Sequence, residues 1–236
     1  MIRRLTQYPV AVAQAIQVIR VAQRLPEPDG ARAGATGAGS DLKLLVFGDS
    51  SAAGVGVTRQ QDALAGHLVA GLSLHHTVSW QLEATSGATT VWGVKTLQDL
   101  APAQADIAVL SLGINDVKNG VPQRIWAKNV DVILTLLTQR HSVRRVYWTA
   151  LPPIGRFPLL PDPLRALLGQ RGDRFDAALK GLIHARPEGR YVPLDLDLDE
   201  THMAPDGFHP GPRIYAEWAD RVCTAILDEP LQDTGR

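Results

Sequence analysis

Residues 42–54 read LKLLVFGDSSAAG, and they decide the fold class because a short apolar run passes directly into small and polar residues. The near-continuous apolar run Leu42–Phe47 predicts a strand that is buried on both faces, as the strands of a parallel sheet are. Ligands bind outside the carboxyl ends of the strands in open parallel sheets. We therefore expect the residues that follow Phe47 to belong to a functional site.

Outward from this stretch, short apolar runs alternate with helical patterns along the chain, which is typical of a parallel sheet wrapped by helices. The further predicted strands are 78–82, 107–112, 143–150 and 191–194. The predicted helices are 64–72, 91–97, 125–137, 167–183 and 214–227. The pattern predicts one α/β domain with a mainly parallel sheet of five strands, and it contains no internal repeat.

Four segments divide the chain. We expect an amphipathic helical segment over 1–29, a flexible Gly/Ala-rich linker over 30–40, the α/β domain over 41–229 and a tail over 230–236. The polar stripe of the first segment consists of Arg3, Gln7, Gln14, Gln17, Arg20 and Arg24. This segment is interrupted too often to span a bilayer. Three interpretations stay open for it: a helix packed on the domain, an interfacial membrane helix within residues 1–24, or a poor export signal.

The composition excludes several function classes. Lys+Arg and Asp+Glu both number 24 in the 236 residues, so the formal charge is zero and no basic excess predicts nucleic-acid binding. The single Cys223 cannot form an intrachain disulfide. We expect no metal site and no cofactor, since the adjacent His75 and His76 cannot present both rings to one ion. The sequence does not indicate an oligomeric state. It fits a cytoplasmic or peripherally membrane-associated protein and leaves export open.

Four loops carry the polar residues that could do chemistry. Three follow strands and are Gly48–Gly54, Thr85–Thr90 and Ser111–Asp116; the fourth, Ala204–Pro210, precedes the last helix. Together they offer a serine hydroxyl, exposable backbone N–H groups, a side-chain amide and an Asp/His pair. These are the groups that acyl transfer needs.

The four blocks, in this order, strongly resemble those of the SGNH hydrolases, also called GDSL esterases and lipases, over about Leu42 to Leu227. The resemblance implies a three-layer αβα sandwich with a flavodoxin-like sheet. It also implies the catalytic residues Ser50 (nucleophile), His209 (base) and Asp206 (its partner), and the oxyanion donors Ser50 N–H, Gly87 N–H and the Asn115 amide. The sequence departs from the family pattern at Thr85, where Asn is frequent, and at Ser51, where Leu is usual.

Each role has a physical reason and a competitor. A serine hydroxyl needs a base to take its proton, and an imidazole held by a carboxylate can do so near neutral pH. Ser51 is the rival nucleophile if the turn is shifted by one residue. A second Asp-x-x-His, with Asp199 and His202, has the same spacing as Asp206 and His209. The Pro-Asp-Gly-Phe-His-Pro context favours the later pair, because it matches the family block.

The loop Pro152–Pro161 is unusually apolar and follows a predicted strand. We expect Ile154, Phe157, Leu159 or Leu160 to line an acyl pocket, although the loop could equally pack only on neighbouring helices. The predicted substrate is a small ester or thioester with a short or medium acyl chain. A carbohydrate O-deacetylase, a catalytically silent acyl-binding module and a nucleotide-binding module remain as alternatives.

Overall fold

The computed structural model describes residues 7–196, 199–229 and 231. Within them, six strands form one sheet: β1 Ala33–Thr36, β2 Ser40–Gly48, β3 His76–Ala84, β4 Ile107–Ser111, β5 Arg145–Thr149 and β6 Gly189–Val192. The helices are α2 Gln7–Val21, α3 Ser50–Ala53, α4 Leu64–Leu72, α5 Thr90–Asp99, α6 Ile114–Lys118, α7 Gln123–Gln139, α8 Leu164–His184 and α9 Pro212–Leu227. Two short 3₁₀ turns are η1 Gln60–Asp62 and η2 Ile154–Arg156.

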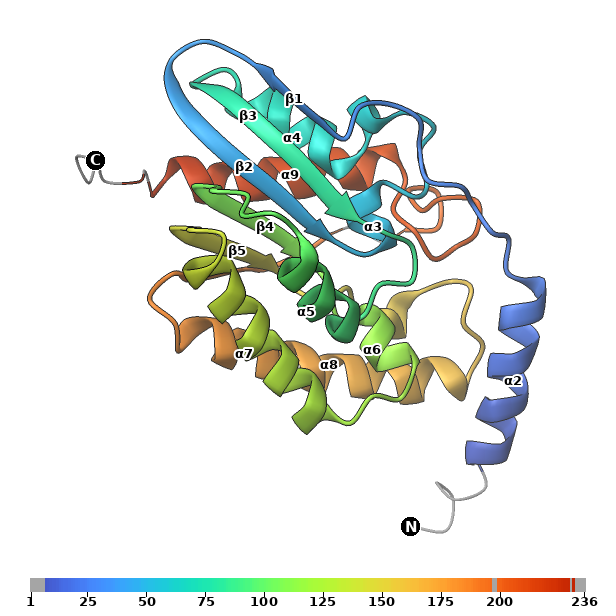
Figure 1. The fold of residues 1–236 in the computed structure, drawn as a ribbon. Helices are drawn as coiled ribbons and strands as arrows, with labels where there is room; N and C mark the ends of the chain where they lie inside the picture. Colours follow the sequence, from blue (N-terminus) through green and yellow to red (C-terminus); the bar gives the residue numbers. More distant parts are fainter. Residues whose placement is uncertain (1–6, 197–198, 230, 232–236) are drawn as a thin grey trace.

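The sheet has the order β1-β3-β2-β4-β5-β6, and every pair except β1 with β3 is parallel. Helix α4 packs on α9 over one face, whereas α5, α7 and α8 pack together over the other (Figure 1). The predicted three-layer α/β fold is therefore confirmed. From β2, the next strand in sequence, β3, lies on one side, whereas β4, β5 and β6 follow on the other side, so the strand order reverses at β2. This point of reversal is where ligands bind in such folds.

The apolar run that predicted the first strand lies at the centre of the core. Leu45, Val46 and Phe47 of β2 are fully buried. Across the sheet, Val46 pairs with Leu82 of β3 on one side and with Val109 of β4 on the other. Burial on both faces and pairing on both edges explain why this segment needs no polar residue between Leu44 and Phe47.

The predicted strand count of five and the linker over 30–40 need correction, because residues 33–36 form a sixth strand. β1 pairs antiparallel with β3, which would otherwise be an edge with unpaired N–H and C=O groups. Small residues suit this position, since a Cβ on Gly34 would come within 3.2 Å of the Trp80 indole nitrogen. Pairing through the backbone needs no hydrophobic pattern, so the sequence carries no sign of this strand.

Helix α2 accounts for the middle of the predicted N-terminal segment, while residues 1–6 of that segment lie outside the described residues. In Figure 1, α2 stands apart from the sheet, beside one end of α8. None of the described helices is both long enough and apolar enough to cross a membrane. The predicted C-terminal tail falls outside the described part of the chain except for residue 231.

Candidate active site

Ser50 lies at the turn where β2 ends and α3 begins. The turn requires Gly48, because a Cβ there would come within 2.0 Å of the Ser111 carbonyl oxygen. The Asp49 carboxylate accepts a 3.0 Å hydrogen bond from the Ser51 N–H and caps α3. The Ser50 N–H is the first of its helix, so no carbonyl inside α3 can accept from it. Ser50 therefore has both its hydroxyl and its N–H at the carboxyl end of the sheet.

His209 meets Ser50 from the loop between β6 and α9. The Nε2 atom of His209 lies 2.9 Å from the Oγ of Ser50, and its Nδ1 atom lies 2.5 Å from Oδ2 of Asp206. A 2.9 Å hydrogen bond from the Ala204 N–H to the His209 carbonyl closes the loop. A hydroxyl, an imidazole and a carboxylate thus form one chain of hydrogen-bonding contacts, with both ring nitrogens engaged.

The Asp206 carboxylate is held in its charged form. Its Oδ1 atom accepts 3.0 Å hydrogen bonds from the N–H groups of Phe208 and His209. Burial would raise the pKa of Asp206, but the hydrogen bonds from the His209 ring and backbone outweigh it and lower the pKa below its usual range. An ionised Asp206 keeps the proton of His209 on Nδ1, which leaves Nε2 free to accept from Ser50.

The loop after β3 and the start of α6 come together beside Ser50. Gly87 has a φ of +83° and open space where a Cβ would lie. Its N–H has no acceptor among the described residues. The buried Asn115 amide donates a 2.8 Å hydrogen bond to the Ala88 carbonyl, which uses one of its two N–H bonds. The Gly87 N–H and the second Asn115 N–H are therefore available to a ligand.

A buried carboxylate fixes these two segments against each other. Asp116 accepts hydrogen bonds from the Thr90 N–H at 2.9 Å and from the Thr90 hydroxyl at 2.7 Å. Asn129 of α7 donates a further hydrogen bond of 3.1 Å to the same hydroxyl. The segments that carry Gly87 and Asn115 are thereby held in place, as preorganised hydrogen-bond donors require.

The Asp49 carboxyl is fully buried behind the Ser50 turn, and burial raises its pKa to about 6, against the opposing effects of the Ser51 N–H, Lys118 and His209. An unfolded chain releases this proton near its ordinary pKa of 3.8. Between these values the folded state binds more protons, so this group's contribution to stability falls as pH rises from about 4 to about 6.

Asparagine never ionises and still caps the helix, so Asp49→Asn avoids the loss of stability that the wild type suffers as pH rises. We expect the free energy of unfolding of Asp49→Asn, minus that of the wild type, to be about 2 kcal/mol larger at pH ~7.5 than at pH ~4. Urea unfolding of both proteins at the two pH values measures this difference. Asp41→Asn, at an exposed position on β2, is the control and should show little change with pH. An equal effect of Asp49→Asn at both pH values would contradict the expectation.

The residues predicted to line an acyl pocket are separated by the structure. Ile154 is fully buried in η2, beside Gly172 of α8, and lines no cavity near His209. The Phe157 ring packs edge-on against Phe208, with 4.9 Å between centroids. The prediction is wrong for the position of Ile154, because the 3₁₀ turn directs this side chain into the core. Leu159 does line a cavity beside His209.

The competing residues lie elsewhere. Ser51 points to a small void of about 30 Å³ that Phe157 also lines, and no contact joins its hydroxyl to His209 within the described residues. The Nε2 atom of His202 lies 2.9 Å from a guanidinium nitrogen of Arg213. The geometry thus brings Ser50, rather than Ser51, and His209, rather than His202, into contact.

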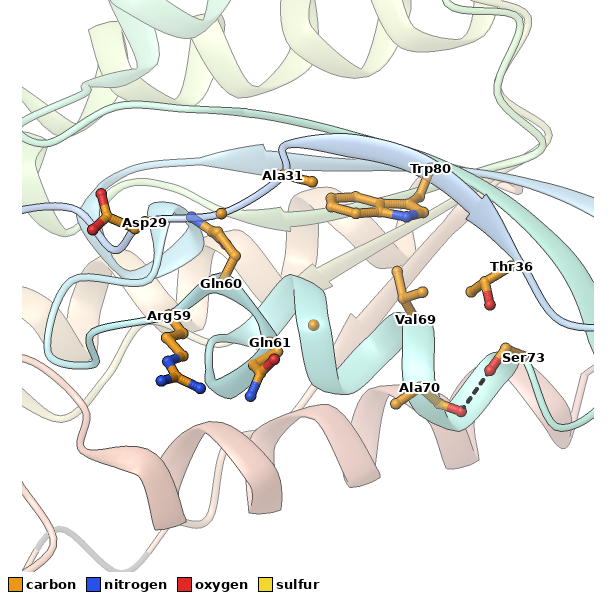
Figure 2. A pocket seen from close by; sticks show the side chains of 12 residues that line it. Asp29, Ala31, Thr36, Arg59, Gln60, Gln61, Val69, Ala70, Ser73 and Trp80 are labelled. Atoms are coloured by element: carbon orange, nitrogen blue, oxygen red, sulfur yellow. Dashed lines mark hydrogen bonds between the residues drawn. The ribbon is translucent and has the colours of Figure 1, made fainter.

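Two cavities differ in their relation to these residues. One of about 330 Å³ has Asp206, Phe208 and His209 in its wall. A larger one of about 780 Å³, drawn in Figure 2, lies between α4 and the segment around β1, where Trp80 faces Val69. None of the triad residues lines the larger cavity, so the smaller one is the candidate for substrate binding.

Sequence reasoning missed two contributors to the site. Asp116 directly follows the predicted Asn115, and its position in the same loop was the available signal. Helix α2 also contributes, since Ala15 and Val18 line the cavity that contains His209. Ala11 and Ala15 share one face of this helix, and Ala22 follows on that face just after its end, but alanine gives too weak a hydrophobic signal to predict a contact.

Comparisons with known proteins find a matching family and similar folds. The sequence profile of the GDSL-like lipase/acylhydrolase family matches residues 46–217, a range that begins near the end of β2 and ends within α9. The GDSL-like esterase Rv1075c of Mycobacterium tuberculosis is 28% identical over 213 residues, covering 82% of this chain and 67% of that protein.

Solved structures show the same fold. The psychrotrophic esterase EstA from Pseudoalteromonas sp. has a TM-score of 0.63 and 16% identity, with 79% of this chain and 97% of that chain covered. The family 3 carbohydrate esterase of Clostridium thermocellum has a TM-score of 0.64 and 16% identity, with coverage of 78% and 94%.

Proposed function

This chain belongs to the GDSL-like lipase/acylhydrolase family and is an esterase, and from that premise we propose that it cleaves carboxylic esters with short or medium acyl chains through an acyl-enzyme on Ser50. The observation that supports this most directly is the continuous contact from Ser50 Oγ to His209 Nε2 and from His209 Nδ1 to Asp206. The cavity beside His209 supports an apolar substrate group.

In the proposed first half-reaction, Ser50 Oγ attacks the ester carbonyl carbon while its proton passes to His209 Nε2. Asp206 holds the ring and stabilises the imidazolium that forms. The C–O bond to the alcohol then breaks, and His209 returns the proton to the leaving oxygen. The products of this step are the free alcohol and an acyl ester of Ser50.

In the second half-reaction, water replaces the alcohol. His209 takes one proton from the water as its oxygen attacks the acyl carbon, and the same proton then returns to Ser50 Oγ as the carboxylic acid leaves. In both tetrahedral intermediates, negative charge develops on the former carbonyl oxygen. We assign its stabilisation to the N–H groups of Ser50 and Gly87 and to the free N–H of Asn115.

Two finer alternatives concern the substrate. A fold neighbour is named a carbohydrate esterase, so removal of acetyl groups from sugars is a second candidate. Against it, most residues that line the cavity beside His209 are aliphatic, and its polar lining apart from Asp206 and His209 is limited to Gln23, Lys118 and Asn119. Thioesters share the acyl group of esters, and we include them in the same substrate class.

A hydrolysis panel with covalent labelling tests the proposal. We expect a fluorophosphonate probe to modify Ser50, as located by mass spectrometry, because only an activated serine reacts in this way. On the panel, p-nitrophenyl esters and acyl thioesters of short and medium chain should give higher kcat/KM than acetylated xylo-oligosaccharides. A folded protein that neither reacts with the probe nor hydrolyses any ester would indicate a silent binding module instead.

A further inference from the structure

Helix α2 is attached to the domain by one side chain in particular. The Gln14 amide donates a 2.6 Å hydrogen bond to the Asp162 carbonyl, and its oxygen accepts one of 3.1 Å from the Leu164 N–H. Leu164 is the first residue of α8, whose preceding Pro163 provides no side-chain cap. Gln14 thus satisfies one of the N–H groups that a helix leaves without an internal partner. Together with the buried Ala11, this contact sets which face of α2 points to the domain.

That inner face covers a cavity. Ala15, Val18 and Ile19 of α2 line it, together with Ala22 just after the helix, at the three- and four-residue spacing of one helix face. Ala15 and Val18 are partly buried against the core, whereas Ile19 is 70% exposed and therefore lies at the rim. The alanines leave room between α2 and the domain, which larger side chains at these positions would fill.

The same cavity is also lined by leucines of the domain and by a smaller set of polar residues, which includes Gln23 and Asn119. Leu159, Leu160, Leu164 and Leu168 line it from α8 and the loop before it. His209 and Asp206 also border it, and the Lys118 ammonium lies 4.5 Å from the centroid of the Phe208 ring. The volume of about 330 Å³ falls within the range of small-molecule sites.

We propose that α2 forms one wall of the substrate site, and that an aliphatic chain of the ester lies between α2 and the leucines of α8 while the ester group reaches Ser50 and His209. This inference rests on the proposed function, because it extends the same site to residues 15–22. The apolar lining and the contact of the cavity with His209 carry it. Residues 15–22 precede the part of the chain that the family profile matches, so chain selectivity would come from a segment outside that region.

Filling the cavity from α2 tests the proposal. Ala15→Trp places a large ring where the chain would lie, and excluding two methylene groups should lower kcat/KM for octanoate relative to acetate by about tenfold or more. The matched control Ile16→Trp adds the same ring on the outer face of α2, where Ile16 is 46% exposed, and should keep the ratio of the wild type. The measurement is the ratio of kcat/KM for p-nitrophenyl octanoate to that for p-nitrophenyl acetate.

A second series identifies which part of the ester carries the chain. Octyl acetate compared with ethyl acetate places the chain on the alcohol, whereas p-nitrophenyl octanoate places it on the acyl group. A selective loss by Ala15→Trp in either series supports the proposal and assigns the chain. If Ala15→Trp and Ile16→Trp gave equal kcat/KM ratios in both series, the proposal would be overturned. It would also be overturned if the wild type hydrolysed acetates and failed to hydrolyse any ester with a longer chain.

Binding to an inactive enzyme separates this inference from the proposed function. In a Ser50→Ala background, decanoate binding measured by calorimetry should weaken about tenfold or more when Ala15→Trp is added, and not when Ile16→Trp is added. This result does not depend on turnover. If the wild type hydrolysed no ester, the proposed function would fail while decanoate binding still decided the role of α2.

Discussion

Replacing Ser50 with alanine is expected to lower kcat for p-nitrophenyl butyrate by about 10⁴-fold or more, since it removes the atom that forms the acyl-enzyme. The Ser50 Oγ is 2.9 Å from His209 Nε2, and no other hydroxyl among the described residues makes this contact. Residual hydrolysis would come only from the oxyanion donors acting on bound ester and water. Steady-state kinetics with active-site titration measures the loss.

Ser51→Ala is the matched control for Ser50→Ala. The two serines are adjacent in α3, and the Ser51 backbone N–H donates a hydrogen bond to the Asp49 carboxylate, a contact that alanine keeps. We expect kcat of Ser51→Ala to stay within about threefold of the wild type. If Ser51→Ala were inactive and Ser50→Ala active, the nucleophile would be Ser51, and the assignment of the turn would be wrong.

His209→Ala is the second change with a large expected effect, a loss of about 10³-fold or more in kcat. Without the imidazole, Ser50 keeps its proton at neutral pH, and the alcohol leaves without a proton donor. Asp206 would also lose its ring partner, while the N–H groups of residues 208 and 209 still hold its carboxylate. The same kinetic assay measures the effect, and thermal unfolding shows whether the loop stays folded.

His202→Ala tests the alternative Asp-x-x-His pair. The His202 ring contacts Arg213 at the start of α9, and the Asp199 carboxylate accepts hydrogen bonds from the Thr201 N–H at 2.9 Å and hydroxyl at 2.6 Å. We therefore expect His202→Ala to retain kcat within about threefold of the wild type. An inactive His202→Ala that unfolds at the wild-type temperature would move the base to His202.

The parallel strands and their helices could be predicted because burial selects for side chains. β2 and β4 are buried on both faces, so almost every residue in Leu44–Phe47 and Ile107–Leu110 is apolar, and the periodic helices bury one stripe each. The last strand was predicted over 191–194, and β6 ends earlier, at Val192, because Pro193 has no N–H with which to continue the ladder. The short helices α3 and α6 are too brief to show a period.

The site divides in the same way. Ser50, Asp206, His209, Gly87 and Asn115 were predicted from short blocks in which the residue type carries the chemistry. Asp116 lies in the same predicted loop as Asn115, but its contact with Thr90 could not be predicted, since a buried carboxylate looks in sequence like any loop aspartate. Of the residues predicted to line a pocket, Leu159 borders the cavity beside His209 whereas Ile154 lies in the core, because the direction of a side chain in a loop depends on turns that composition does not encode.

By itself, the sequence determined the α/β class through its local apolar runs, and four short blocks in order gave the resemblance to the esterase family that implies the site residues. Only the tertiary structure decided that residues 33–36 extend the sheet and that α2 covers a cavity beside His209. Backbone pairing requires no side-chain pattern, and a cavity is the space left between distant segments. Neither property resides in any one stretch of the chain.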